Sequence, residues 1–204
     1  AGTAGPITNA RAALRSPQFL VLAATFFTCC ATHSGPIFHT VSYAMACGLP
    51  VMTAVTIYSV EGLAGLGGRL FLGLAADRRG AKPVLIAGLL VQAFAAGSYL
   101  FARDIDQFYA VAVVFGMAYG GVVPLYAVLA REYFGPAIMG TVFVAAAMVS
   151  SLGMALGPSL GGLIYDSFND YQWLYISAFM LGLGATAIAF AFPPQPSRLK
   201  LQPA

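Results

Sequence analysis

Six apolar segments, separated by short clusters of charged residues, glycine or proline, fill most of this chain. They cover residues 18–47, 50–76, 83–102, 107–130, 137–165 and 171–192. Each has about the 20 residues, or more, that an α-helix needs to cross roughly 30 Å of hydrocarbon. Strands are not expected, because sustained two-residue alternation is missing and an open sheet would leave backbone groups unsatisfied in lipid. The chain is therefore predicted to be an all-α membrane protein with six transmembrane helices.

The composition agrees with a lipid environment. Only 8% of the 204 residues are charged, while 59% are hydrophobic. Water-soluble domains carry about 25% charged residues, so the lipid bilayer is the expected solvent. A net charge of +3 is too small to predict binding to nucleic acid. The cysteines Cys29, Cys30 and Cys47 lie in apolar runs and are expected to pack rather than to bind metal.

The basic residues predict the orientation of the chain. If the amino terminus is cytoplasmic, only Arg103 faces outside, and eight basic residues face the cytoplasm: Arg11, Arg15, Arg78, Arg79, Lys82, Arg131, Arg198 and Lys200. This bias is typical of cytoplasmic loops. We expect a multi-pass protein of the plasma (inner) membrane with both termini in the cytoplasm.

The same segments predict three parts: a cytoplasmic linker at 1–16, a transmembrane domain at 17–192 and a cytoplasmic tail at 193–204. No signal-peptide pattern precedes the first span, and the first residue is Ala1. We therefore expect the chain to continue a longer one.

A weak repeat divides the six spans into two sets of three. Pro36 and Pro124 lie near the middle of the first and fourth spans. Positions 36 and 77 are 41 residues apart, positions 124 and 166 are 42 apart, and Asp77 and Asp166 each end a Gly-x-x-x-Asp sequence. Because three is an odd number, equivalent spans of the two sets cross the membrane in opposite directions. We predict a 3+3 inverted repeat.

A charged loop, GLAADRRGAK at 73–82, interrupts the apolar sequence between the second and third spans. Asp77 could bond to the positive amino end of a helix, while Arg78 and Lys82 face the negative leaflet. The alternative is that the basic residues only fix the topology. Gly73 and Gly80 complete the pattern Gly-x-x-x-Asp-Arg-x-Gly-x-Lys.

With this loop, the chain resembles the major facilitator superfamily over residues 11–195. Residues 73–82 look like the signature loop of that family, and a linker with six helices looks like its carboxy-terminal half. The resemblance implies transport by alternating access and a loop that latches one half onto the other. It also implies a missing amino-terminal six-helix half as partner, in the same longer chain or in a second copy.

Two further runs, GRLFLG at 68–73 and HTVSYAMACGL at 39–49, are similar to the monocarboxylate transporters and the oxalate:formate antiporter. The resemblance implies that Arg69, four residues before the first glycine of the loop, binds substrate. Animal monocarboxylate transporters carry Asp where this chain has Gly65, and the oxalate carrier has a Lys in its eleventh helix that the fifth span lacks. A substrate with one carboxylate is therefore the expectation.

Arg69 and Glu61 are charged residues within the second span. A cation at this depth is costly unless it is paired or faces water, and the planar guanidinium of Arg69 can grip a carboxylate bidentately. The alternative is an arginine that snorkels or pairs within the bundle. Glu61, eight residues earlier, is the candidate for carrying a coupling proton, or else an acid that hydrogen-bonds a neighbouring helix.

Histidines and tyrosines supply the remaining candidates. His33 and His39 flank the Gly35-Pro36 break, where a helix can kink and open towards a cavity. His39 is predicted to line the substrate cavity, as are Tyr119 and Tyr126 of the fourth span. The alternative for each is a hydrogen bond between helices.

Glycines at 153, 157 and 161 form a small-residue ridge on the fifth span, which is expected to let another helix approach closely.

The prediction for function is one half of a secondary transporter for a small organic anion, proton-coupled or exchanging. A non-transporting module of the same fold, such as a receptor, assembly subunit or inactive fragment, is the alternative. Because no nucleotide-binding loop and no Ser/His/Asp or metal constellation is present, we expect neither an enzyme nor a cofactor or metal site.

Overall fold

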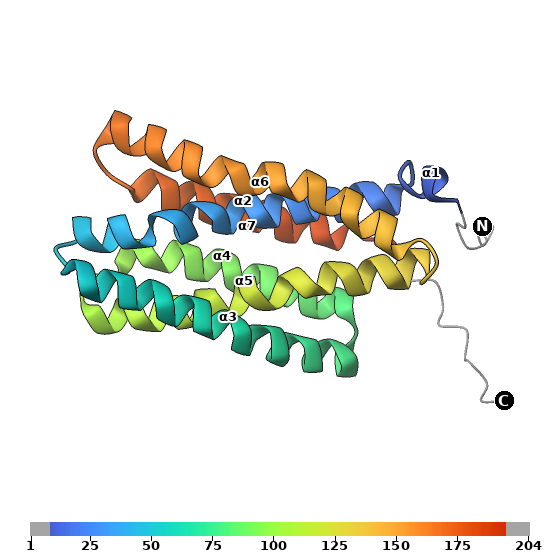
Figure 1. The fold of residues 1–204 in the computed structure, drawn as a ribbon, viewed down its shortest axis with the longest axis horizontal. Helices are drawn as coiled ribbons and strands as arrows, with labels where there is room; N and C mark the ends of the chain where they lie inside the picture. The colour runs from blue at the N-terminus through green and yellow to red at the C-terminus, as the bar shows by residue number, and fades with distance from the viewer. Residues whose placement is uncertain (1–8, 195–204) are drawn as a thin grey trace.

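A computed structural model describes residues 9–194 as a bundle of six long helices (Figure 1). The elements are α1 (Ala10–Ala13), α2 (Pro17–Ala46), α3 (Val51–Arg79), α4 (Ala81–Ser98), the 3-10 turn η1 (Tyr99–Phe101), α5 (Ile105–Phe134), α6 (Met139–Phe168) and α7 (Gln172–Phe190). Six of these, with α4 and η1 counted as one, are long and apolar enough to cross a membrane. The predicted all-α fold with six spans is confirmed. Parts of the predicted linker and tail lie outside the described residues. Arg198 and Lys200 lie outside them too.

Local signals explain where the helices begin and end. The Ser16 hydroxyl accepts a hydrogen bond from the backbone N–H of Phe19 at 3.2 Å, and Pro17 opens α2. Asp104 caps α5 in the same way, since its carboxylate accepts from Gln107 N–H at 2.9 Å. Gly80 has a φ of 90°, a left-handed conformation that suits glycine, and separates α3 from α4.

The charged loop at 73–82 differs from its expected form. The predicted span ended at 76, yet α3 continues through Asp77 to Arg79, and α4 starts at Ala81. Only Gly80 breaks the helical path. The basic residues Arg78 and Arg79 lie in the last turn of α3, where positive charge favours the carbonyl end of a helix.

The 3+3 inverted repeat is present in the fold. Equivalent helices have matching lengths: α2 and α5 have 30 residues each, with Pro36 and Pro124 as the twentieth residue of each. The most extensive helix contacts are those of α2 with α6 and of α3 with α5. If each helix is replaced by its equivalent in the other repeat, α2 by α5 and α6 by α3, the first pair becomes the second. The pairs α2–α7 and α4–α5 exchange in the same way. Helix α1, the α3–α4 turn, the α5–α6 turn and the end of α7 lie at one end of the bundle, here named the α1 end (Figure 1).

Glycines hold the two closest helix pairs together. The predicted ridge on α6 is confirmed: a Cβ on Gly153 or Gly157 would overlap the backbone of α2, and one on Gly161 would overlap the His39 ring. The symmetry-related pair uses glycines from both helices, because a Cβ on Gly68 would overlap the Met117 backbone and one on Gly120 the Gly65 backbone. Such contacts let helix backbones touch.

Two helices leave broad apolar faces uncovered within this unit. On α3 the exposed face includes Leu63, Leu66, Leu70 and Leu74, and on α6 it includes Val144, Met148, Leu152, Leu160 and Leu163. Large exposed apolar patches mark membrane or protein contacts. The α3 and α6 faces are therefore suited to lipid or to a partner helix unit.

Candidate functional site

The carboxyl group of Glu61 lies in the interior of the bundle, and the residue has no exposed surface. The Tyr99 hydroxyl donates a hydrogen bond to Glu61 Oε2 at 2.9 Å, whereas Oε1 has no hydrogen-bond partner among residues 9–194. The Thr40 hydroxyl lies near this carboxyl group and donates to the Pro36 carbonyl oxygen at 2.6 Å. That carbonyl belongs to the helix bend predicted at Gly35-Pro36.

Aromatic side chains surround this carboxyl group. The Tyr175 hydroxyl is buried without a hydrogen-bond partner, and its ring lies 5.3 Å from the ring of Tyr99. The Tyr43 hydroxyl donates to the Tyr99 carbonyl oxygen at 3.1 Å. Buried polar atoms without partners are costly. Residues of α2, α3, η1 and α7 thus enclose a polar centre with two free acceptor or donor positions, Glu61 Oε1 and the Tyr175 hydroxyl.

Tyr119 connects this centre to Arg69. Its hydroxyl interacts electrostatically with both the Glu61 carboxyl group and the Arg69 guanidinium. A Cβ added to Gly65 would lie 3.6 Å from the Tyr119 hydroxyl, an ordinary van der Waals distance, so Tyr119 packs directly against α3 at this position.

Arg69 is exposed on α3, two turns beyond Glu61. Eight residues of helix place the two side chains about 12 Å apart along the axis and about 80° apart around it. No direct ion pair forms between these two described residues, as the spacing predicts. Tyr119 interacts electrostatically with both of these predicted site residues, Arg69 and Glu61.

His33 belongs to a neighbouring polar cluster between α2 and α4. Gln92 Nε2 lies 3.3 Å from His33 Nδ1 and donates to the Cys29 carbonyl oxygen at 3.1 Å. The ring of His33 also lies 5.4 Å from the ring of Tyr119. His33 is buried and bonded between helices, as its alternative prediction states.

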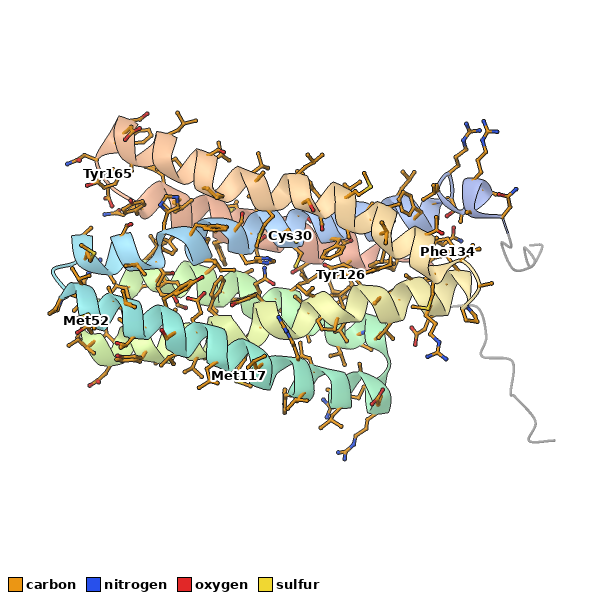
Figure 2. The ribbon with its side chains drawn as sticks, in the orientation of Figure 1. Cys30, Met52, Met117, Tyr126, Phe134 and Tyr165 are labelled. Atoms are coloured by element: carbon orange, nitrogen blue, oxygen red, sulfur yellow. The ribbon has the colours of Figure 1, made fainter. Side chains whose placement is uncertain are left out.

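Two other predicted site residues lie apart from this group. Tyr126 has no exposed surface, stacks on Phe26 at 4.1 Å and donates to the Thr25 carbonyl oxygen; Figure 2 shows it inside the bundle. His39 packs against Gly161 of α6, with its ring 5.3 Å from Tyr171, and its Nε2 has no hydrogen-bond partner. In this conformation neither residue adjoins Arg69.

The signature loop contains one residue with a clear bond. Lys82 Nζ donates to the Phe192 carbonyl oxygen at 2.6 Å, just beyond the end of α7. The Tyr133 hydroxyl donates to the next carbonyl, that of Pro193, at 2.7 Å. Asp77 and Arg78 are exposed, and Gly73 is half-buried. Lys82 therefore ties the α3–α4 turn to the end of α7, a contact that the sequence does not indicate.

Sequence reasoning missed several members of the group, among them Gln92 and Tyr99. Gln92 has a detectable signal, because a lone amide within an apolar span usually bonds inside the bundle. Tyr99 has none, since a tyrosine at the end of a span is an ordinary interface residue. Within residues 9–194, no three His, Cys, Asp or Glu side chains gather closely enough to hold a metal ion.

Comparison with known proteins identifies related chains. The sequence profile described as Major Facilitator Superfamily matches residues 2–158 and, in a second alignment, 62–204. The chain is 32% identical over 109 residues to the uncharacterized MFS-type transporter YuxJ of Bacillus subtilis, covering 53% of this chain and 28% of that protein.

Two more relatives are a bicyclomycin resistance protein homolog of Haemophilus influenzae and the uncharacterized MFS-type transporter YhjX of Escherichia coli. The first is 28% identical over 128 residues, or 63% of this chain and 32% of that protein. The second is 28% identical over 124 residues, or 60% of this chain and 31% of that protein. The matched part of the chain spans about a third or less of the length of these relatives.

Proposed function

The chain belongs to the Major Facilitator Superfamily, and we propose that it forms the carboxy-terminal half of a secondary transporter for a small organic anion with one carboxylate. The observation that carries this proposal is the position of Arg69. Its side chain is exposed on α3, two turns from the buried Glu61, and interacts electrostatically with Tyr119. Relatives named as MFS-type transporters support a transport function.

The carboxylate of the substrate would be held by Arg69 and Tyr119. A guanidinium offers two parallel N–H donors that match the two oxygens of a carboxylate. The Tyr119 hydroxyl can donate a third hydrogen bond to the same group. One arginine, without a second cation nearby on α6, fits a monocarboxylate better than a dicarboxylate.

Glu61 would couple the anion to a proton. Its carboxyl group interacts with Tyr119, which would also contact the substrate. A proton on Glu61 removes a negative charge from the neighbourhood of the bound anion and thereby strengthens anion binding. By linkage, the bound anion strengthens proton binding by the same factor. Proton-coupled uptake follows if both ligands cross together, and exchange follows if the empty site does not reorient.

The other predicted residues have secondary places in this proposal. His39 and Tyr126 would reach the substrate only in a conformation in which α2 and α5 repack. The latch that meets the other half would be formed by Gly73, Asp77, Arg78 and Gly80. Lys82 would hold the loop against the end of α7. The exposed faces of α3 and α6 would contact the missing amino-terminal half.

Counterflow in proteoliposomes tests the proposal. The chain would be reconstituted alone and together with an amino-terminal half. The proteoliposomes would be loaded with lactate, pyruvate, oxalate, formate or a neutral amino acid. We expect exchange of monocarboxylates by the two halves together and little exchange of oxalate or amino acid. Exchange of the neutral amino acid alone would refute the anion assignment. No counterflow of any solute by the assembled halves would favour a non-transporting module.

A further inference from the structure

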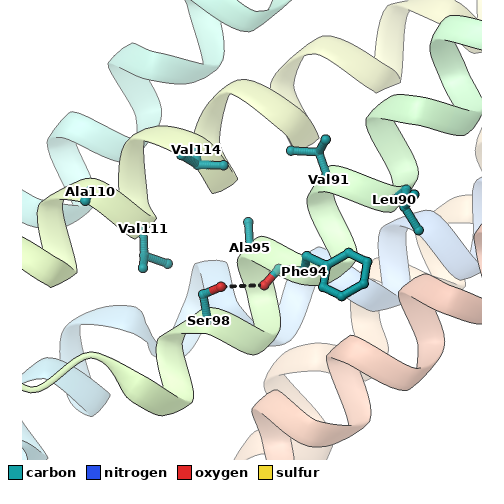
Figure 3. Close-up of a pocket in the computed structure, with 8 residues that line it drawn as sticks. All are labelled: Leu90, Val91, Phe94, Ala95, Ser98, Ala110, Val111 and Val114. Carbon is teal, nitrogen blue, oxygen red and sulfur yellow. Dashed lines mark hydrogen bonds between the residues drawn. The ribbon is translucent and has the colours of Figure 1, made fainter.

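A long apolar groove runs along the outside of the bundle between α4 and its neighbours. Near the α1 end it has a volume of about 480 Å³ between α3, α4 and α5, and its lining includes Phe71, Arg79, Ala87 and Met117. A second section of about 400 Å³ continues between α4 and α5 towards Ser98 (Figure 3). The two sections share Val91 and Val114, so they form one groove.

The polar groups of the groove lie unequally at its two ends. Arg79 is exposed and lines the section near the α1 end, and a smaller adjoining hollow there is lined by both Arg78 and Arg79. At the far end, the Ser98 hydroxyl already donates to the Phe94 carbonyl oxygen at 2.7 Å (Figure 3). The remaining lining is apolar. The groove therefore has a positively charged end at Arg79 and an apolar length, and its lining has no second polar side chain that is free to bind a ligand.

The groove is longer than one leaflet of hydrocarbon is thick, so it has room for one lipid tail. From Pro83 to Ser98 the groove follows 15 residues of α4, about 22 Å of helix. One leaflet contributes about half of a hydrocarbon core of roughly 30 Å. A single acyl chain can therefore lie in the groove with its head at Arg79, at the membrane surface where Arg78 and Arg79 end α3.

The groove is separate from the proposed substrate site. Arg69 and Phe71 are two residues apart on α3, which places them about 160° apart around the helix. Arg69 faces the Tyr119 side, and Phe71 faces the groove. Occupants of the groove and of the substrate site therefore contact opposite flanks of α3.

We propose that this groove is a binding site for an anionic phospholipid, with one acyl chain between α4 and α5 and the phosphate on Arg79. An arginine fork binds phosphate oxygens bidentately, and a basic residue at a membrane surface attracts anionic lipid. A zwitterionic lipid has the same tail, but its own cation opposes Arg79. The site thus distinguishes lipids by head-group charge.

Native mass spectrometry of the complete transporter tests this site. The protein would be exposed to equal amounts of phosphatidylglycerol and phosphatidylcholine with identical acyl chains. We expect at least a fivefold preference for one bound phosphatidylglycerol. Arg79→Gln should abolish the preference, and Ala87→Phe, which fills the groove from an exposed position on α4, should abolish retention of that lipid.

Matched variants separate the site from general effects. Arg103→Gln removes an exposed arginine at the other end of the bundle, and Ala187→Phe enlarges an exposed alanine of α7 near the α1 end; both should retain the preference. Melting temperatures would verify folding, with Ala87→Leu replacing Ala87→Phe if the latter does not fold. Equal retention of the two lipids by the wild type, or an unchanged preference in Arg79→Gln, would overturn the proposal. Displacement of the phospholipid by equimolar oleate would also overturn it, since the occupant would then be a free fatty acid.

Discussion

Arg69 and Glu61 lie two turns apart on α3 in opposite environments. Arg69 is exposed, while Glu61 is buried with one oxygen bonded to Tyr99 and the other unpartnered. Ionisable groups at membrane depth are expensive and usually functional. In the proposed function the two residues have different tasks: the exposed Arg69 would bind the anion, and the buried Glu61 would hold the coupling proton.

Replacement of Arg69 should affect anion binding directly. Arg69→Ala removes two charge-assisted hydrogen bonds, each worth about 1.5–3 kcal/mol. The expected result is at least a roughly hundredfold loss of apparent affinity, measured as the concentration dependence of monocarboxylate uptake in the complete transporter. Arg69→Lys keeps the positive charge but loses the two parallel N–H donors of the guanidinium, so it should weaken uptake less than Arg69→Ala does. Normal uptake by Arg69→Ala at both low and saturating substrate would disprove the assignment.

Replacement of Glu61 should separate coupling from exchange. Glu61→Gln preserves the shape of the side chain and can still accept from Tyr99, but it cannot change its charge. We expect loss of uphill uptake driven by a pH gradient, with anion counterflow retained. Asp106→Asn, an exposed acid at the start of α5, is the control and should transport normally. If Glu61→Gln still accumulates substrate with a pH gradient, the coupling proton is carried elsewhere.

At the scale of helices, packing between α3 and α5 is set by glycines that sit side by side. Gly68 touches the Met117 backbone, whereas the adjacent Gly67 faces open space. A Cβ on Gly120 would overlap the Gly65 backbone, and the neighbouring Tyr119 interacts electrostatically with Glu61 and Arg69. The geometry of the candidate site is therefore a product of this helix contact.

A pair of alanine substitutions tests the contact. Gly67→Ala should leave stability unchanged or raise it by up to about 1 kcal/mol, because alanine favours helix over glycine. Gly68→Ala should lower stability despite the same propensity gain, since its Cβ overlaps the Met117 backbone and forces the helices apart. Thermal unfolding of the two variants in detergent measures the difference. Equal melting temperatures would show that α3 and α5 are not in close contact.

For the whole molecule, the topology follows from the odd number of spans in each repeat and from the distribution of arginine and lysine. The α1 end carries Arg78, Arg79, Lys82 and Arg131, whereas Arg103 lies at the opposite end. From the positive-inside rule we predict that the α1 end faces the cytoplasm.

Cysteine labelling measures this orientation. The half-buried Cys47 lies at the same end as residue 104, so it should first be replaced by Ser. In that background, Asp104→Cys should react with a membrane-impermeant maleimide added to intact cells. Arg131→Cys should react only after the membrane is opened. The reverse pattern would show that the α1 end is external.

The amino-acid sequence alone determined the six spans, the inverted repeat and the glycine ridge on α6, and it singled out Arg69 and Glu61 as candidate site residues. These features follow from local quantities: the length of apolar runs, the cost of a charge in lipid and the four-residue spacing of glycines. Tertiary structure decided which polar residues meet. It placed Tyr99 on Glu61, paired Gln92 with His33 and bonded Lys82 to the end of α7, and it kept His39 and Tyr126 away from Arg69. Spacing along one helix fixes the angle and height of a side chain, but its neighbour across a helix contact depends on how closely two backbones approach.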